Sequence, residues 1–140
     1  MEIKKIGVLG TGQMGTGIIQ VFAQSGYEVI GVDSSRDMLD RTVQSIDKRL
    51  GGRVEKGKMS QDDKEAVMAR ISTSMKLEDL GDCDLIEEAI PEDLELKKQI
   101  FAKLDGICKK ETLLGTNTSG LAVTDMAAAT QRGDKLLGMH

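Results

Sequence analysis

Three glycines near the N-terminus constrain this chain more than any other feature of its sequence. They form the pattern Gly10-x-Gly12-x-x-Gly15, which follows the apolar run 6–9 and precedes a helical pattern of apolar residues. In such a strand-turn-helix unit, the glycines permit a tight turn, close approach of a diphosphate, and close packing of the helix on the strand. The N–H groups that begin the helix can then hold phosphates. The predicted contact residues are Gly10, Gly12, Gln13, Met14 and Gly15.

An acidic residue stands where a dinucleotide-binding unit needs one. The second apolar run, 28–32, ends at Asp33, about 20 residues beyond the last glycine. A carboxylate at this strand end accepts hydrogen bonds from the adenosine ribose and repels a 2′-phosphate, so NAD is favoured over NADP. An ordinary turn before an exposed aspartate would have the same residues. Arg36 is also close enough in sequence to weaken the preference for NAD.

Composition favours a single domain and argues against several partners. The 140 residues suffice for one domain with a core, over 1–140. A net charge of −4, with only two Phe and one Tyr, argues against a nucleic-acid surface. Cys83 and Cys108 are not spaced as metal ligands, so we expect no metal site and a reducing, cytoplasmic compartment. No long apolar run or leader precedes the first strand, so we expect no membrane partner.

Strand and helix patterns alternate along the rest of the chain. Ser34 or Ser35 can cap a helix that has Thr42 on its apolar face and breaks at Gly51-Gly52. Ser60 with Asp63 resembles a capping box for a second helix. Further strands are predicted at 71–74, 84–90, 113–116 and 136–139. Further helices are predicted at 94–108, where Asp93 can act as the cap and Leu96 should turn toward the sheet, and at 123–129. This alternation predicts an α/β fold with a Rossmann-type doubly wound and mostly parallel sheet. The helix that Ser34 or Ser35 begins and the helix that Ser60 begins would form a protruding helical hairpin.

Polar residues follow two predicted strands at the edge where such sheets bind ligands. Because ligands lie beyond the carboxyl ends of parallel strands, the loops 89–93 and 117–120 should face the glycine turn. Asn117 and Ser119 can hydrogen-bond a ribose or a substrate oxygen, although turns and helix caps also favour these residue types. The other candidates near this edge, which a turn or a solvated surface would equally explain, are Ala89, Glu92 and Lys97.

Two further features allow a functional or an ordinary interpretation. Basic residues crowd the predicted hairpin, namely Lys48, Arg49, Arg53, Lys56 and Lys58. They suit either a solvated hairpin tip or a docking site for a phosphate-bearing substrate. The only histidine, His140, is the last residue and follows a predicted strand. Its imidazole suits a general base in the same crevice, while a terminal histidine is also compatible with an incidental residue or a tag remnant.

Taken together, the motifs resemble the 3-hydroxyacyl-CoA dehydrogenase family, most closely its bacterial 3-hydroxybutyryl-CoA dehydrogenases. The matching segments, in the order and spacing of the family, are 10–18, Asp33, 88–93, 117–119 and 138–140. The resemblance covers the whole chain. It implies an NAD-dependent oxidoreductase that interconverts (3S)-3-hydroxyacyl-CoA, such as 3-hydroxybutyryl-CoA, and 3-oxoacyl-CoA, in fatty acid or butanoate metabolism.

The resemblance also implies a role for each candidate residue. His140 would take the proton from the 3-hydroxyl as hydride leaves C3, and Ser119 would contact the 3-oxygen. Lys56 matches a lysine that contacts coenzyme A in the family. The cofactor would be contacted by Asp33 at the adenosine ribose, by Asn117 on the nicotinamide side, and by Glu92 and Lys97.

This chain departs from the family at its end. Family members continue beyond the histidine to a glutamate that orients it, and to a C-terminal helical domain that forms a homodimer and completes the substrate pocket. Because the sequence ends at His140, we expect this domain to be absent. The resemblance therefore implies that this chain binds NAD(H) with little dehydrogenase activity alone.

Two other classes of protein remain open at this point. Another β-hydroxyacid dehydrogenase, of the 3-hydroxyisobutyrate or 6-phosphogluconate type, also begins with a similar glycine loop, but resembles neither the ending 138–140 nor the basic hairpin. A non-catalytic nucleotide-binding or redox-sensing module would keep the loop and Asp33, while having no use for Ser119 and His140.

Overall fold

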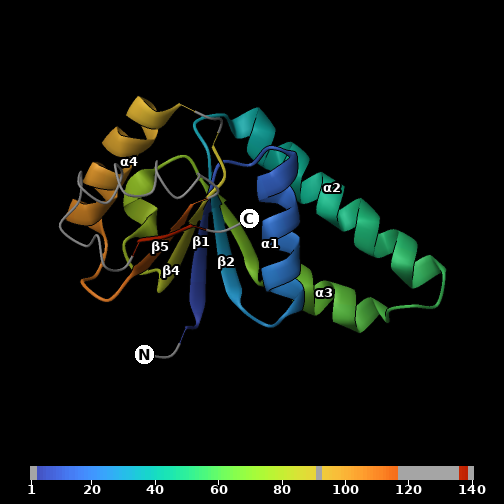
Figure 1. Cartoon of the computed structure of the whole chain (residues 1–140). Helices are drawn as coiled ribbons and strands as arrows, with labels where there is room; N and C mark the ends of the chain where they lie inside the picture. The colour runs from blue at the N-terminus through green and yellow to red at the C-terminus, as the bar shows by residue number, and fades with distance from the viewer. Residues whose placement is uncertain (1–2, 91–92, 117–135, 139–140) are drawn as a thin grey trace.

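A six-stranded sheet runs through the middle of the molecule (Figure 1). The computed structural model describes residues 3–90, 93–116 and 136–138. The strands are β1 (Lys5–Leu9), β2 (Glu28–Val32), β3 (Ile71–Ser74), β4 (Leu85–Glu88), β5 (Leu113–Thr116) and β6 (Leu136–Gly138). Their order is β3-β2-β1-β4-β5-β6, and every neighbouring pair is parallel. This order confirms the predicted doubly wound, Rossmann-type sheet.

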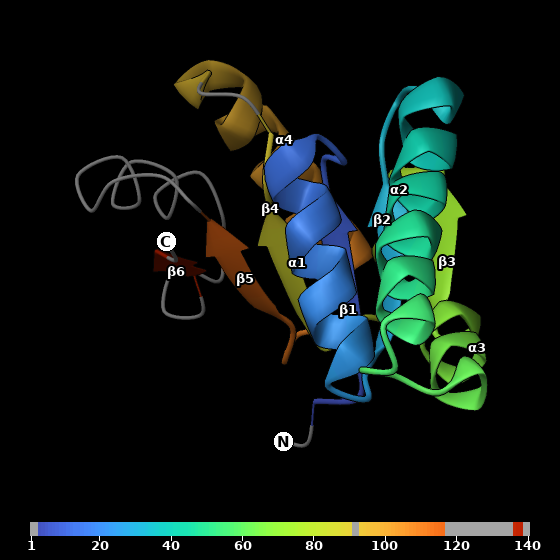
Figure 2. The same cartoon turned by 90° about the vertical axis from the view of Figure 1, so that its right-hand side faces the viewer.

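Helices cover both faces of this sheet. Helices α1, α2 and α3 lie on one face, as Figure 2 shows, and the short η1 and helix α4 lie on the other. Their bounds are α1 (Gln13–Gln24), α2 (Arg36–Glu55), α3 (Gln61–Ala69), η1 (Leu77–Leu80) and α4 (Leu94–Ile107). Helices α2 and α3 pack against each other as a helical hairpin, whose turn lies away from the sheet in Figure 1.

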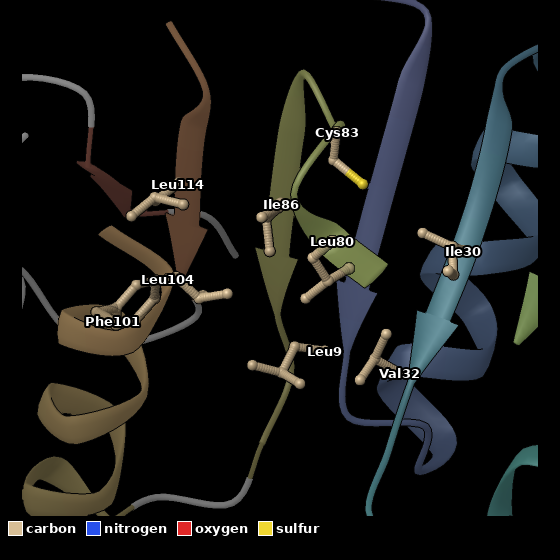
Figure 3. Close-up of a cluster of buried hydrophobic side chains, with 9 residues drawn as sticks. All are labelled: Leu9, Ile30, Val32, Leu80, Cys83, Ile86, Phe101, Leu104 and Leu114. Atoms are coloured by element: carbon tan, nitrogen blue, oxygen red, sulfur yellow. The ribbon is translucent and has the colours of Figure 1, made fainter. Parts of the chain in front are cut away.

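Each face of the sheet has its own apolar cluster. Toward α4, Figure 3 shows strand residues Leu9, Ile86 and Leu114 with Phe101 and Leu104 of the helix. Toward α1, the cluster contains Ile6, Val8, Ile19, Ala23, Val29, Ile46, Leu50, Val67 and Leu85. Because successive strand residues point to opposite faces, burial of both faces requires the nearly continuous apolar strands seen in the sequence.

Three helices begin with the side-chain caps that the sequence indicates. The hydroxyl of Ser35 accepts from the N–H of Met38, and that of Ser60 accepts from the N–H of Asp63. Asp93 begins α4 in the same way, through its carboxylate. Each cap satisfies a backbone donor that the first turn of a helix leaves without an internal partner.

The predicted break of α2 at Gly51-Gly52 is wrong. The helix continues to Glu55, although each glycine lowers helix stability by roughly 1 kcal/mol relative to alanine. Two contacts favour the longer helix. Leu50 is completely buried, and the ammonium of Lys64 in α3 lies 3.1 Å from the carboxylate of Asp47 in α2. These contacts hold α2 against the rest of the fold directly before the two glycines.

Other boundaries differ from the predictions by a few residues. Strand β4 covers 85–88 rather than 84–90, β6 ends at Gly138, and α4 ends at Ile107. Leu96 is not turned toward the sheet, because it is 42% exposed. The predicted helix 123–129 lies outside the described residues. In the part of the chain that the structure describes, no helix is long and apolar enough to cross a membrane.

Candidate cofactor site

A cavity of about 860 Å³ lies beyond the carboxyl ends of β1, β2 and β4, next to the glycine turn. This is the edge where ligands bind in open α/β sheets, beside the point at which the strand order changes direction. The predicted site residues in its lining are Gly10, Gly12, Gln13, Met14, Asp33 and Ala89. The structure therefore brings together residues that are up to 79 positions apart in the sequence, from Gly10 to Ala89.

Close approach of backbones explains two of the glycines. Gly10 has a φ of +96°, and a Cβ there would lie 2.9 Å from the carbonyl of Ala89. A Cβ on Gly15 would lie 1.9 Å from the carbonyl oxygen of Gly10, closer than any side chain allows. The third glycine differs, since a Cβ on Gly12 would meet no atom within 4 Å. Because Gly12 lines the cavity, its missing side chain leaves room for a ligand against the backbone.

The start of α1 is suited to an anion. Among the α-helices that the structure describes, only α1 lacks a side-chain cap, since its N-cap residue is Gly12. Its first turn also contains no acidic residue. The positive end of the helix dipole therefore favours a phosphate group in the cavity.

Asp33 is held in the lining by three hydrogen bonds. Its Oδ2 accepts from the backbone N–H and the hydroxyl of Thr11, at 3.0 and 2.9 Å. Its Oδ1 accepts from the backbone N–H of Ser35 at 3.0 Å. A carboxylate offers roughly four acceptor positions, so this arrangement leaves capacity for a donor such as a ribose hydroxyl.

Arg36 is drawn away from this carboxylate. Its guanidinium donates to the hydroxyl of Thr73 at 3.2 Å and lies 3.8 Å from the carboxylate of Asp40. The cavity lining does not include Arg36. The guanidinium that could receive a 2′-phosphate thus contacts Thr73 and Asp40 in this structure.

Besides Thr11 and Ser34, apolar side chains line the remainder of the cavity, and the sequence motifs do not indicate most of them. They are Leu9, Val32, Met38, Met75, Leu77, Ile90, Leu96 and Ile100. Met75 and Leu96 are large apolar residues left 49% and 42% exposed. Such surfaces suit the faces of a planar base. Met75 directly follows β3, so the rule that ligands bind beyond strand ends would have identified it.

The family model described as "3-hydroxyacyl-CoA dehydrogenase, NAD binding domain" matches residues 5–140. The chain belongs to this family. It is therefore an NAD-binding domain, and the glycine turn, the uncapped helix and Asp33 fit NAD. The match favours this family over the other β-hydroxyacid dehydrogenases.

Individual relatives agree with the family. The chain is 42% identical to the 3-hydroxybutyryl-CoA dehydrogenase of Clostridioides difficile, over 97% of this chain and 48% of that protein. It is 45% identical to a probable 3-hydroxybutyryl-CoA dehydrogenase of Deinococcus radiodurans, over 97% of this chain and 49% of that protein. The crystal structure of 3-hydroxybutyryl-CoA dehydrogenase from Escherichia coli superposes with a TM-score of 0.96 at 36% identity, covering 100% of this chain and 30% of that chain. The chain thus spans about half the length of the first two relatives.

Lys97, which the family resemblance places beside the cofactor, is buried in the structure. Its ammonium lies 3.1 Å from Oε1 of Glu88, and neither side chain is exposed. Glu88 also accepts from the hydroxyl of Thr116 at 2.7 Å and from the N–H of Ile90 at 2.8 Å. Lys97 does not line the cavity. The carboxylate with which it pairs, that of Glu88, holds the loop that contains Ala89 and Ile90, and both of these residues line the cavity.

The basic residues of the hairpin lie at the other end of α2 from Asp33. Lys56 follows the last residue of this helix, and a helix of 20 residues is about 30 Å long. The exposed cations around the turn are Lys48, Arg49, Arg53, Lys56 and Lys58. None of these five side chains lines the cavity.

The remaining predicted site residues lie outside the described residues. They are Glu92, Asn117, Ser119 and His140. Asn117 and Ser119 follow β5, which ends at Thr116, and His140 follows β6, which ends at Gly138. Both strands run parallel to β1. Among the described residues, no group of three or more His, Cys, Asp or Glu gathers as metal ligands.

Proposed function

We propose that this chain supplies the NAD site of an enzyme that interconverts (3S)-3-hydroxyacyl-CoA and 3-oxoacyl-CoA, with 3-hydroxybutyryl-CoA as the substrate. The observation that carries the proposal is the combination of Gly12, open to the cavity at the uncapped start of α1, with Asp33 held beside it. The first feature suits a diphosphate, and the second suits the adenosine ribose. The names of the most similar relatives support the substrate.

Residues in three parts of the cavity would hold the cofactor. Asp33 would accept from the ribose, and the turn from Gly10 to Gly15 would donate to the diphosphate. The apolar side chains of Met38 and Met75 would face the adenine, while Ala89 would contact the cofactor beyond β4. Glu92, Lys97 and Asn117 are further proposed contacts, which rest on the family resemblance.

His140 and Ser119 would carry the chemistry of the substrate. When bound, NAD accepts the hydride that leaves C3 of the hydroxyacyl thioester. His140 would take the proton from the 3-hydroxyl, and in the reverse direction would return it to the developing alkoxide. Ser119 would hydrogen-bond the same oxygen and orient it. Lys56 would pair with a phosphate of coenzyme A through its exposed ammonium.

The cellular setting follows from the same substrate. We propose that residues 1–140 act as the NAD-binding domain of a homodimer, which forms through the part of the relatives that this chain does not span. We place the protein in the cytoplasm and in fatty acid or butanoate metabolism, because its bacterial relatives are named for an acyl-CoA thioester. A non-catalytic nucleotide-binding module remains the alternative, and it would not need Ser119 or His140.

Parallel titrations with NADH and NADPH test the cofactor assignment. We expect NADH to bind more tightly, since Asp33 would repel the 2′-phosphate of NADPH. Asp33→Ala should weaken NADH binding by roughly 10- to 100-fold, because it removes a charged acceptor, and should narrow the difference between the two cofactors. Asp37→Ala is the control, because Asp37 is exposed, pairs with Arg41 and lies outside the cavity. Absence of binding of either cofactor, or an equal loss of both in Asp33→Ala, would contradict the proposal.

A further inference from the structure

Thr11, between the first two glycines of the turn, is held from both sides. Its N–H and hydroxyl donate to Asp33, as described above. Its carbonyl oxygen accepts from the hydroxyl of Thr42, in α2, at 2.9 Å. The hydroxyl of Thr16, in α1, lies 2.8 Å from that of Thr42 and 3.3 Å from the same carbonyl. All three threonines are at least 95% buried.

The proton count indicates the order of these bonds. Each hydroxyl has a single proton to donate. The shorter contact to the carbonyl of Thr11 comes from Thr42, so Thr42 donates there and Thr16 donates to Thr42. A buried chain of hydroxyls thus runs from α1 through α2 to a carbonyl of the glycine turn.

The carbonyl of Thr11 controls the direction of the next N–H group. The peptide bond between Thr11 and Gly12 is planar and trans, so its C=O and N–H point in opposite directions. The carbonyl points into the protein, toward the buried hydroxyl of Thr42. The N–H of Gly12 therefore points the other way, toward the cavity that Gly12 lines.

We propose that Thr42 is a positioning residue of the cofactor site. By holding the carbonyl of Thr11, it fixes the peptide plane that directs the N–H of Gly12 at the cofactor diphosphate. The glycines on either side of Thr11 are flexible, so without this bond the plane can rotate and the donor must be ordered again on binding. The inference rests on the proposed NAD function and adds a residue from α2, which the glycine motif does not contain.

The test compares NADH affinity and thermal stability in three variants. Thr42→Val keeps the shape of the side chain and removes the hydroxyl, whereas Thr42→Ser retains it. Thr112→Val is the matched control, because Thr112 is also fully buried and donates to a carbonyl, that of Cys83, at 2.8 Å. Thr112 does not line the cavity.

We expect Thr42→Val to weaken NADH binding by about three- to tenfold, because the carbonyl of Thr11 loses its nearest donor. Thr42→Ser should restore most of the affinity. Thr112→Val should also lower the melting temperature but leave NADH affinity unchanged. Normal NADH affinity in Thr42→Val would overturn the inference while leaving the proposed function intact. Failure of the unsubstituted chain to bind NADH would refute both.

A second comparison separates the diphosphate from the ribose. Adenosine, measured by its displacement of NADH, has the ribose but no phosphate. Thr42→Val should weaken adenosine binding less than NADH binding, and an equal loss would contradict a role at the diphosphate. Thr16→Val provides the same test from α1, where we expect a smaller loss than in Thr42→Val. The double variant should lose less than the sum of the two, because both hydroxyls act through one carbonyl.

Discussion

Glu87 is a carboxyl group that the fold buries without compensation. It lies on β4, is 4% exposed, and its Oε1 accepts no hydrogen bond in the described part of the chain. Burial, together with the neighbouring charge of Glu88, raises the pKa of Glu87 to about 7. In an unfolded chain the same group has a pKa of about 4.5. The folded protein therefore favours the protonated form of Glu87.

This shift predicts a pH dependence of stability. Between pH 4.5 and 7 the folded state binds more protons than the unfolded state, so the free energy of unfolding should fall as the pH rises through this range. Glu87→Gln should remove the slope and stabilise the protein at pH 8 by about 1–3 kcal/mol. Urea unfolding at several pH values measures both effects, with the exposed Glu55→Gln as control.

Asp84, whose pKa is also strongly shifted, does not affect the pH dependence expected for Glu87. Hydrogen bonds from Lys109 and from the N–H groups of Lys4 and Lys5 lower the pKa of Asp84 to about 2. Its stabilising contribution is lost only as the pH falls from about 4 through 2. An unchanged slope between pH 5 and 8 in Glu87→Gln would thus refute the assignment to Glu87.

Single residues are easiest to predict where local geometry decides the residue type. Gly10, Gly12 and Asp33 line the cavity at positions that a strand-turn-helix unit fixes in the sequence, whereas Gly15 is not in the lining. Thr42 was predicted only as part of an apolar helix face. Helical spacing shows that a residue faces inward, but not that its hydroxyl meets a particular carbonyl. The hydroxyl of Thr42 could therefore be recognised only in three dimensions.

At the scale of elements, alanine substitutions at two glycines of α1 should change stability in opposite directions. Gly15→Ala would place a methyl group 1.9 Å from the carbonyl oxygen of Gly10, so the helix must move away from β1. We expect a loss of NADH binding and of at least about 2 kcal/mol of stability. Gly17→Ala, two residues later, meets no atom within 4 Å and should stabilise the helix by about 0.5–1 kcal/mol.

Thermal unfolding and NADH titration of both variants measure these effects on one helix. Gly17→Ala serves as the control, because it makes the same substitution in the same helix without the contact. A Gly15→Ala protein that binds NADH normally would show that close packing of α1 on the turn is not needed for the site.

Element boundaries were predictable where a chemical signal marks them, and less so elsewhere. Ser60 and Asp93 predicted the starts of α3 and α4, because each side chain caps the helix that follows. Gly51 and Gly52 predict a break, but α2 passes through them. Each glycine lowers helix stability by only about 1 kcal/mol, so a pair of glycines does not by itself mark the end of a helix.

At the scale of the whole molecule, one buried ion pair joins three elements. Glu88 of β4 contacts Lys97 of α4 and Thr116 of β5. Lys97→Met would leave the carboxylate of Glu88 in the interior without its cation. We expect a loss of roughly 3–5 kcal/mol in the free energy of unfolding, which urea titration measures.

Two comparisons make this prediction specific. Lys98→Met alters the adjacent lysine, whose partner Glu95 is 79% exposed, and should cost less than about 1 kcal/mol. Adding Glu88→Gln to Lys97→Met should recover part of the stability, because it removes the unpaired charge. A cost for Lys97→Met as small as that of Lys98→Met would show that the pair contributes little.

Alternating strand and helix patterns predicted the parallel sheet, but not the full composition of the cavity. The carboxyl ends of several strands come together only once the strands are ordered in the sheet. Met75, which follows β3, and Leu96, in α4, therefore looked unrelated in the sequence but lie in one lining. Leu96 in particular was expected in the core, since a helical pattern cannot distinguish a core from a pocket.

The strand order has a consequence for folding of the chain during its synthesis on the ribosome. Of the six strands described, β1 is synthesised first and lies at the centre of the sheet, between β2 and β4. Strand β4 begins only at Leu85, so at 5–20 residues per second one edge of β1 waits roughly 4–15 s for its neighbour. During that time an apolar strand with unpaired backbone groups is exposed to other chains. Slower translation before Leu85 would lengthen this period, and the yield of folded protein should then depend more strongly on chaperones.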